Sequence, residues 1–188
     1  MSKEVPGILN IGVDVDGVVA SIYKKINRLV NENLGVDMKA IREAQGQTDY
    51  WLHRWPQITA ISGGSEFVCG LWDNPDVFRG AERVPGAVKT LNQWRKQNYQ
   101  IWFITSRNEE SVGLATKRWF EENGLGWAVN EGRILFISPQ DKDRPSFKSA
   151  AAKRLGLNVF IEDHDETLAG IEGPTMMIKI LIACHHNS

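Results

Sequence analysis

A short apolar run near the N-terminus, broken abruptly by acidic residues, constrains the fold more than any other feature of the chain. Residues Ile8 to Val13 carry little polar interruption, and Asp14-Val15-Asp16-Gly17 follows at once. An apolar run of this length is typical of a strand that is buried on both faces of a parallel sheet. We therefore predict a buried strand over Ile8 to Val13 that ends in a functional loop.

Strand and helix patterns alternate along most of the chain. Strands that alternate with helices connect through right-handed β-α-β crossovers and form a mostly parallel sheet with helices on both faces. The predicted fold class is therefore α/β, with a Rossmann-like three-layer core. The predicted helices are Ser21 to Leu34, one that opens at Pro85-Gly86, Glu109 to Asn123 and Ser146 to Leu155, and the later strands are Tyr99 to Thr105, Arg133 to Ile137, Asn158 to Glu162 and Met176 to Ile182.

The stretch from Val36 to Arg83 breaks this alternation. It mixes aromatic residues with turn residues such as Pro56 and Gly63-Gly64, and it has no strong strand signal. Such a composition favours a small irregular or helical insertion. The predicted organisation is a core of residues 1–19 and 84–188, interrupted by an insertion of residues 20–83.

Composition and charge limit the class of protein. With 188 residues, of which 42% are hydrophobic and 24% charged, the chain can bury one sizeable core. The formal charge of -1 provides no basic field for nucleic acid or an anionic membrane, so a nucleic-acid partner is not expected. Met1 to Pro6 lack a signal peptide's apolar stretch and Met176 to Ala183 is too short to span a bilayer, so we expect a cytoplasmic location.

The two cysteines do not indicate a metal site or a disulfide framework. Cys69 and Cys184 lie far apart in the sequence and match neither kind of spacing. We expect both to be reduced and buried.

Polar residues follow the predicted strands at the points where the strands end. Ligands of parallel α/β sheets gather at the carboxyl ends of the strands, so these residues are the first candidates for a site. A lysine at the start of a later helix, Lys148, would lie near the same sheet edge. The residues delivered by the strands are Asp14, Asp16 and Gly17, then Thr105, Ser106 and Arg107, and then Glu162, Asp163 and Asp165.

Carboxylates gathered at one edge repel one another unless a cation neutralises them, and oxygen ligands suit Mg²⁺. With Mg²⁺ present, Asp14 can attack phosphorus and form an aspartyl-phosphate, which divides a slow hydrolysis into two easier steps. Gly17 lets the chain turn, so that Asp16 can approach the leaving oxygen as general acid and then base. Thr105 and Lys148 would hold the phosphoryl oxygens, and Asp163 would anchor the metal.

These motifs resemble the haloacid dehalogenase superfamily. The resemblance rests on DVDGVV after an apolar strand (Asp14 to Val19), on Ile104-Thr105-Ser106, on Lys148 and on Glu162-Asp163. Within that superfamily, three segments look like the 5'(3')-deoxyribonucleotidases: WDNPDVF (Trp72 to Phe78), VPGA (Val84 to Ala87) and FITS (Phe103 to Ser106). The spacing of the motifs covers nearly the whole chain.

The resemblance implies a Mg²⁺ cofactor and a role for each matched residue. It makes Asp14 the nucleophile and a metal ligand, and Asp16 the acid/base and a metal ligand through its backbone carbonyl. Asp163 becomes the remaining protein ligand, Thr105 and Lys148 become phosphate ligands, and Ser106 lies near the phosphate.

Two positions depart from the family pattern. Glu162 stands where the family often has aspartate, which leaves its role open. Arg107 stands where the deoxyribonucleotidases tend to have proline, which leaves the substrate's identity open.

The resemblance also makes residues 20–83 a helical cap that closes over the site and excludes water. Its aromatic residues can stack on a nucleobase, or they can form the core of the cap. Phe67 and Trp72 are the two we assign to the substrate-binding set, together with Gly17, Ser106 and Arg107. The aromatic residues in question are Trp51, Trp55, Phe67, Trp72 and Phe78.

Three charged positions admit two interpretations each. Lys148 is either the phosphate ligand or a solvated helix lysine, with Lys142 or Lys153 in its place. Arg107 either clamps a phosphate or base, or forms a surface ion pair with Glu109 or Glu110. The adjacent residues Asp165 and Glu166 either contact the metal through water or lie at the start of a helix.

Three of the histidines are also considered as site residues. His164 lies between two aspartates and either tunes the site or points away from it. The adjacent His185-His186 is typical of a chain end without partners.

The function predicted from these features is a Mg²⁺-dependent 5'-nucleotidase that dephosphorylates (deoxy)nucleoside monophosphates. The expected partner is thus a small phosphorylated substrate. The alternatives are a phosphatase for a sugar phosphate or phosphoglycolate, a nucleic-acid-end phosphatase, and a binding module without turnover. A monomer and a homodimer both stay open.

Overall fold

The computed structural model describes residues 8–45, 52–138, 140–141 and 143–183. Their centre is a five-stranded sheet in the order β5-β4-β1-β6-β7, in which every neighbouring pair is parallel. The strands are β1 (Asn10–Val13), β4 (Gln100–Asn108), β5 (Ile134–Ile137), β6 (Val159–Glu162) and β7 (Ile178–Leu181).

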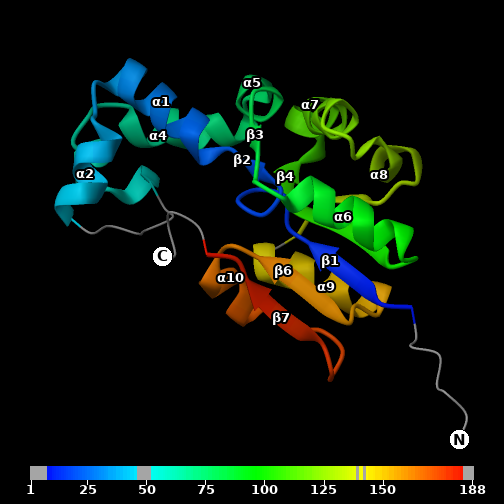
Figure 1. The fold of residues 1–188 in the computed structure, drawn as a ribbon. Coiled ribbons are helices and arrows are strands. Elements are labelled where there is room, and N and C mark those ends of the chain that lie inside the picture. The colour runs from blue at the N-terminus through cyan, green and yellow to red at the C-terminus, as the bar shows by residue number, and fades with distance from the viewer. Residues whose placement is uncertain (1–7, 46–51, 139, 142, 184–188) are drawn as a thin grey trace, which may run out of the picture.

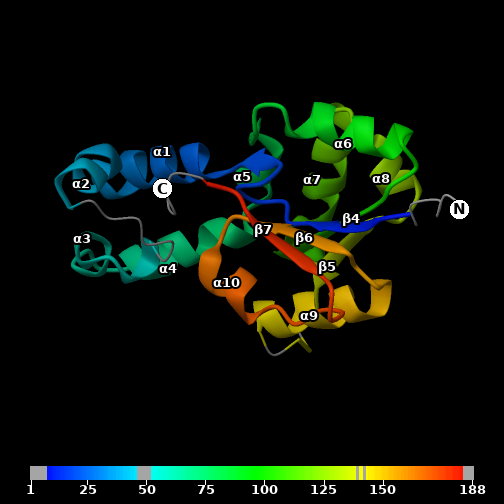
Figure 2. The same ribbon diagram turned by 60° about the horizontal axis from the view of Figure 1, so that its bottom comes forward.

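Helices cover both faces of the sheet, which confirms the predicted three-layer α/β core (Figures 1 and 2). Figure 2 shows α6, α7 and α8 on one face and α9 and α10 on the other. The bounds are α6 (Ala87–Lys96), α7 (Glu109–Glu122), α8 (Gly126–Asn130), α9 (Arg144–Leu155) and α10 (Asp165–Gly170).

The predicted N-terminal strand lies at the middle of the sheet. Val13 pairs in register with Phe103 of β4 on one side and with Ile161 of β6 on the other. Gly12 allows the chain from α9 to approach, because a Cβ at that position would lie 2.5 Å from Leu157 Cδ1. The carboxyl ends of three adjacent strands therefore meet directly after Val13.

Residues 20–45 and 52–83 form a helical segment that projects from one side of the sheet (Figure 2). The short strands β2 (Ala20–Ser21) and β3 (Glu82–Arg83) pair antiparallel where the chain leaves and re-enters the core. The division of the chain at residues 20 and 83 stays a prediction. The segment contains α1 (Tyr23–Leu34), α2 (Met38–Gln45), α3 (Pro56–Thr59), α4 (Gly64–Gly70) and α5 (Pro75–Arg79), with 3-10 helices at Leu52–Arg54 and Leu71–Asp73.

One apolar cluster connects the sheet with the helical segment. It includes Val13 and Phe103 of the sheet as well as Trp55 and Phe78 of the helical segment, all at most 1% exposed. A second cluster packs the other face of β4 and β6 against α9. Because they share a core with the sheet, the helices of residues 20–83 are positioned relative to the strand ends.

The structure departs from the predicted elements in several places. The strand predicted to end at Thr105 continues through Asn108, with a register shift against β5 after Thr105. Helix α8 was not predicted, and α10 corresponds to the helix opening that was one of the two interpretations of Asp165 and Glu166. Cys69 is exposed, so the expectation that it is buried was wrong; it lies on the short helix α4, whose polar side faces water. Cys184 lies outside the described residues.

Among the described residues, no helix combines the length and apolar character that crossing a membrane requires.

Candidate active site

A small cavity of about 40 Å³ lies at the carboxyl ends of β1, β4 and β6. Space of this size holds a few water-sized groups. It therefore matches a phosphate better than a whole nucleotide while the helical segment is in its present position. The cavity is lined by Asp14, Asp16, Trp72, Phe78, Ser106, Arg107, Arg144, Lys148, Glu162, His164 and Thr167.

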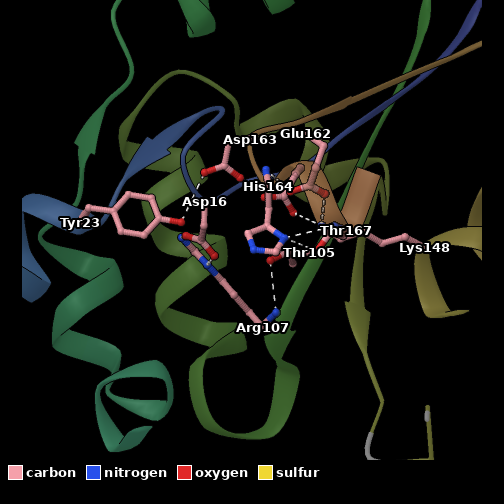
Figure 3. Close-up of polar contacts among 10 residues, drawn as sticks. Asp16, Tyr23, Thr105, Arg107, Lys148, Glu162, Asp163, His164 and Thr167 are labelled. Carbon is pink, nitrogen blue, oxygen red and sulfur yellow. Dashed lines mark hydrogen bonds and ion pairs between the residues drawn. The ribbon is translucent and has the colours of Figure 1, made fainter. Parts of the chain in front are cut away.

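Lys148 binds residues at the ends of both β1 and β6. Its Nζ donates to Glu162 Oε2 at 2.6 Å (Figure 3). It also donates to Asp14 Oδ1 at 2.7 Å, and the residue is only 2% exposed. This position excludes the solvated-lysine interpretation. Lys153 instead pairs with the exposed Glu172, and Lys142 lies outside the described residues. The contact also gives Glu162, whose role the sequence left open, a definite partner.

Burial controls the protonation of this cluster. It raises the pKa of Asp14 from 3.8 to about 7, with the charge of Glu162 adding to the rise and Lys148 opposing it. Burial also raises the pKa of Glu162, again against the effect of Lys148. For Lys148, burial acts in the opposite direction, but Asp14 and Glu162 outweigh it and hold the pKa above its ordinary value. The lysine is therefore cationic at neutral pH.

Asp16 is held by Arg107 from β4. The guanidinium donates from Nε to Asp16 Oδ2 at 3.0 Å and from Nη2 to Oδ1 at 2.6 Å (Figure 3). Its Nη1 donates to Thr116 Oγ1 at 2.9 Å, and its plane lies over Phe78, 4.0 Å from the ring centroid. Of the two interpretations of Arg107, the surface ion pair was wrong, because the extension of β4 buries this side chain; Glu109 pairs with Lys117 instead.

Asp163 lies on the other side of the site, against Gly17 and Tyr23. The Tyr23 hydroxyl donates to Asp163 Oδ2 at 3.3 Å (Figure 3). Gly17 has φ +81, and a Cβ there would lie 1.7 Å from the same carboxylate oxygen. Glycine is thus required at this position both by the turn after β1 and by the close approach of Asp163.

The acidic cluster has the composition of a site for a hard divalent cation. Asp14, Glu162 and Asp163 each have a carboxylate oxygen within 4.8 Å of the others, and all three side chains are buried. When all are ionised, the four buried carboxylates of the site outnumber its buried lysine and arginine by two. Mg²⁺ prefers such oxygen ligands and would restore neutrality. The residues present therefore fit the predicted metal.

Ser106, and not Thr105, lines the cavity. Side chains alternate along a strand, so neighbouring residues at its end point in opposite directions. Thr105 is completely buried, and its Oγ1 accepts from the backbone N–H of Arg107 at 3.2 Å. Ser106 Oγ is buried and has no hydrogen-bond partner within the described part of the chain. It is the hydroxyl that is available to a ligand.

The cap aromatics divide between core and cavity. Trp72 and Phe78 line the cavity. Trp55 is fully buried in the core and Phe67 packs against that core without lining the cavity, so the packing interpretation holds for these two. Trp51 lies outside the described residues.

The residues after Asp163 open helix α10. His164 caps this helix: its Nδ1 accepts from the Thr167 backbone N–H at 3.1 Å, and both residues line the cavity. Asp165 and Glu166 lie in the first turn and are exposed, as expected for a helix opening. His185-His186 falls outside the described residues.

Sequence reasoning did not single out Arg144 or Thr167 for the cavity. Arg144 begins α9 directly after Asp143, whose side chain accepts from the Ser146 backbone N–H and caps the helix. Its guanidinium lies 5.8 Å from the centroid of the Trp72 ring. Asp143 as an N-cap residue, followed by Pro145 in the first turn, was the available sign that the helix starts at Arg144.

The chain is similar in sequence to two nucleotidases of bacteria, although no family model matches it. A putative nucleotidase of Bacillus cereus is 25% identical over 176 residues, which cover 88% of this chain and 82% of the relative. A putative 5'(3')-deoxyribonucleotidase of Chlorobaculum tepidum is 24% identical over 168 residues, 87% of this chain and 73% of the relative.

The fold is shared with haloacid dehalogenase-like hydrolases. One such protein from Streptococcus pneumoniae superposes with a TM-score of 0.62 at 16% identity, over 94% of this chain and 85% of the other. A second, from Deinococcus radiodurans, was solved with bound phosphate and sodium; its TM-score is 0.58 at 17% identity, over 87% and 76% of the two chains. The chain therefore shares the fold of haloacid dehalogenase-like hydrolases, and its sequence is similar to that of two putative nucleotidases.

Proposed function

We propose that this haloacid dehalogenase-type phosphatase is a Mg²⁺-dependent 5'-nucleotidase that forms an aspartyl-phosphate on Asp14. The observation that carries the proposal is the buried contact of Asp14 with Lys148, next to Asp163 and at the floor of a phosphate-sized cavity. The substrate would be a (deoxy)nucleoside monophosphate.

In the first step, a carboxylate oxygen of Asp14 attacks phosphorus and the bond to the leaving oxygen breaks. Lys148 is cationic and lies 2.7 Å from Asp14 Oδ1, so it can stabilise the charge that spreads over the phosphoryl oxygens. Ser106 Oγ is buried and has no partner among the residues that the structure describes, so it would donate to one of those oxygens. Asp16 gives a proton to the leaving alkoxide.

In the second step, water attacks the phosphorus of the aspartyl-phosphate. Asp16 accepts a proton from this water, the bond between phosphorus and Asp14 breaks, and phosphate leaves. The two steps return Asp14 and Asp16 to their starting protonation.

The Mg²⁺ site would consist of the Asp14 and Asp163 carboxylates and the Asp16 backbone carbonyl. A bound Mg²⁺ would neutralise phosphoryl charge and offset the repulsion among the carboxylates. Tyr23 and Gly17 keep Asp163 in place for this role.

Two observations support a nucleoside substrate. Aromatic residues line the cavity, and the two relatives similar in sequence are a putative nucleotidase and a putative 5'(3')-deoxyribonucleotidase. Trp72 and Phe78 come from the helical segment and line the cavity together with Arg144 of α9 and Thr167 of α10. A base stacked on such a ring gains about 1–3 kcal/mol. A nucleoside enters only if the helical segment shifts, because the present cavity has a volume of about 40 Å³.

A panel of phosphomonoesters assayed with and without Mg²⁺ tests the substrate class. The proposal predicts Mg²⁺-dependent release of phosphate from deoxynucleoside monophosphates, with much lower kcat/KM for sugar phosphates and phosphoglycolate. Preference for those small esters, or for phosphorylated oligonucleotide ends, would refute the nucleotidase assignment. Absence of turnover on every ester would refute the phosphatase itself and leave a binding module.

Asp14→Asn tests the nucleophile, since the amide keeps the shape of the side chain but cannot attack phosphorus. We expect kcat to fall by a factor of at least about 10⁴. Asp37→Asn is a matched control, because exposed Asp37 caps α2 through its Oδ1 and asparagine can cap in the same way. Unchanged activity in Asp14→Asn would contradict the mechanism.

A further inference from the structure

We propose that Arg107 is a positioning residue that orients Asp16 for proton transfer to the leaving group, and that it does not bind the substrate phosphate. The inference rests on the proposed phosphatase chemistry and adds a new residue to it. The observations that carry it are the contacts of the guanidinium, its burial, and the elements to which it is anchored.

The guanidinium is already occupied by protein oxygens. Nε and Nη2 donate to the two carboxylate oxygens of Asp16, at 3.0 and 2.6 Å, and Nη1 donates to Thr116 Oγ1 at 2.9 Å. The Arg107 side chain is 1% exposed, compared with 11% for Asp16. A side chain this enclosed, with each nitrogen engaged, is built to hold Asp16 and leaves the more exposed Asp16 to face the substrate.

A bidentate pair fixes the orientation of a carboxylate as well as its position, because two parallel hydrogen bonds prevent rotation about the last side-chain bond. Each carboxylate oxygen has two lone-pair positions. An Asp16 oxygen that accepts from Arg107 therefore keeps one position for proton exchange. Arg107 thus restricts Asp16 without blocking it.

Arg107 is itself anchored by two elements outside β4. Thr116, which is fully buried, belongs to α7. Phe78, also fully buried, belongs to α5 in the helical segment, and its ring centroid lies 4.0 Å from the guanidinium carbon. A guanidinium stacked on an aromatic face keeps its hydrogen-bonding edge free for other partners. The orientation of Asp16 consequently depends on packing between the core and the helical segment.

The role of Arg107 can be tested by changing the leaving group of the substrate. When Asp14 attacks a nucleoside 5'-phosphate, the bond from phosphorus to the 5' oxygen breaks and the alkoxide needs the proton that Asp16 supplies. The 4-nitrophenolate released from 4-nitrophenyl phosphate is a weak base and leaves without a proton. A residue that positions Asp16 should therefore matter for the first ester and not for the second. A residue that binds the phosphate should matter equally for both.

The experiment compares kcat/KM for a deoxynucleoside monophosphate and 4-nitrophenyl phosphate in wild type and Arg107→Met. This ratio reports the steps up to formation of the phosphoenzyme, so the later hydrolysis does not mask the effect. We expect a loss of about a hundredfold for the nucleotide and less than about tenfold for the aryl ester. Arg95→Met, which removes an exposed arginine at the far end of the sheet, should change neither.

Two further variants distinguish loss of the Arg107–Asp16 contact from a general loss of structure. Thr116→Val preserves shape and leaves the Asp16 contacts intact, so it should give a smaller loss with the same dependence on the leaving group. In an Asp16→Asn background, Arg107→Met should cause little further loss for the nucleotide, because both changes remove one function.

Equal losses on the two esters, additive losses in the double variant, or a gain of activity in Arg107→Met would each overturn the positioning role while the phosphatase assignment stands. Failure of the wild type to hydrolyse either ester would overturn the proposed function and this inference with it.

Discussion

Asp14→Asn should stabilise the Mg²⁺-free protein at pH 8, although it removes the proposed nucleophile. Asp14 is buried, with 5% of its surface exposed, and its pKa rises from 3.8 to about 7 because burial disfavours the charged form. An asparagine of the same shape carries no charge and keeps an oxygen that can accept from Lys148. The substitution therefore removes an electrostatic cost at little loss of packing.

The magnitude follows from the shift in pKa. Between about pH 4 and pH 7 the unfolded chain has lost the Asp14 proton and the folded protein retains it, so the wild type loses stability as the pH rises through this range. A shift of about three pKa units at 1.36 kcal/mol each sets an upper bound of about 4 kcal/mol. The advantage of the variant should be about 0.6 kcal/mol at pH 4 and largest above pH 7.

Urea unfolding followed by far-ultraviolet circular dichroism, with EDTA at pH 4.5 and pH 8, measures both differences. We expect a gain of at least about 1 kcal/mol at pH 8 and only about a quarter of that gain at pH 4.5. Saturating Mg²⁺ should reverse the order, since binding at about 100 times Kd stabilises by about 2.7 kcal/mol only the chain that holds the ion. A variant that is less stable than the wild type at pH 8 in EDTA, or a gain independent of pH, would refute this reasoning.

Three other substitutions probe the metal site and the aromatic wall. Gly17→Ala should weaken Mg²⁺ binding by at least about tenfold in calorimetry, because its Cβ would meet Asp163 Oδ2 at 1.7 Å; Gly35→Ala, with φ +65 but open space, is the control. Tyr23→Phe, which removes the 3.3 Å contact with the same carboxylate, should raise the Mg²⁺ dissociation constant by up to about tenfold. Trp72→Ala should raise KM for a nucleoside monophosphate by about tenfold or more, and leave inhibition by inorganic phosphate unchanged.

Each of these expectations has a contrary outcome. Equal Mg²⁺ affinities of the two glycine variants would mean that backbone strain, and not contact with Asp163, limits the site. An unchanged affinity in the tyrosine variant would remove Tyr23 from the support of the metal. A rise in KM that extends to phosphate itself would make Trp72 a structural residue.

The meeting of Asp14, Lys148 and Asp163 was predictable from the sequence. Apolar runs followed by polar residues mark strand ends, and in a parallel sheet these ends share one edge. The register confirms the reasoning, since Val13 aligns with Phe103 and Ile161 on its two sides. The hydrophobic pattern and the parallel topology are sufficient to predict this contact, because buried strands are recognised in the sequence by their apolar residues.

The contact between Arg107 and Asp16 was not predictable in this way. It joins residues 91 positions apart and requires β4 to continue beyond Thr105, where the apolar pattern stops. The choice of Ser106 over Thr105 for the cavity depends on the phase of the strand at its end, which a register shift alters. Polar contacts of this kind follow from local geometry that hydrophobic periodicity does not encode.

In the proposed mechanism, Asp14 is the residue that becomes phosphorylated. Acid quenching during turnover, followed by borohydride reduction and peptide mass spectrometry, identifies an aspartyl-phosphate by its conversion to homoserine. The account predicts homoserine at position 14 in wild type with Mg²⁺ and substrate, and none when Mg²⁺ is removed. Phosphate released with no modification at Asp14, or with the modification at another residue, would contradict it.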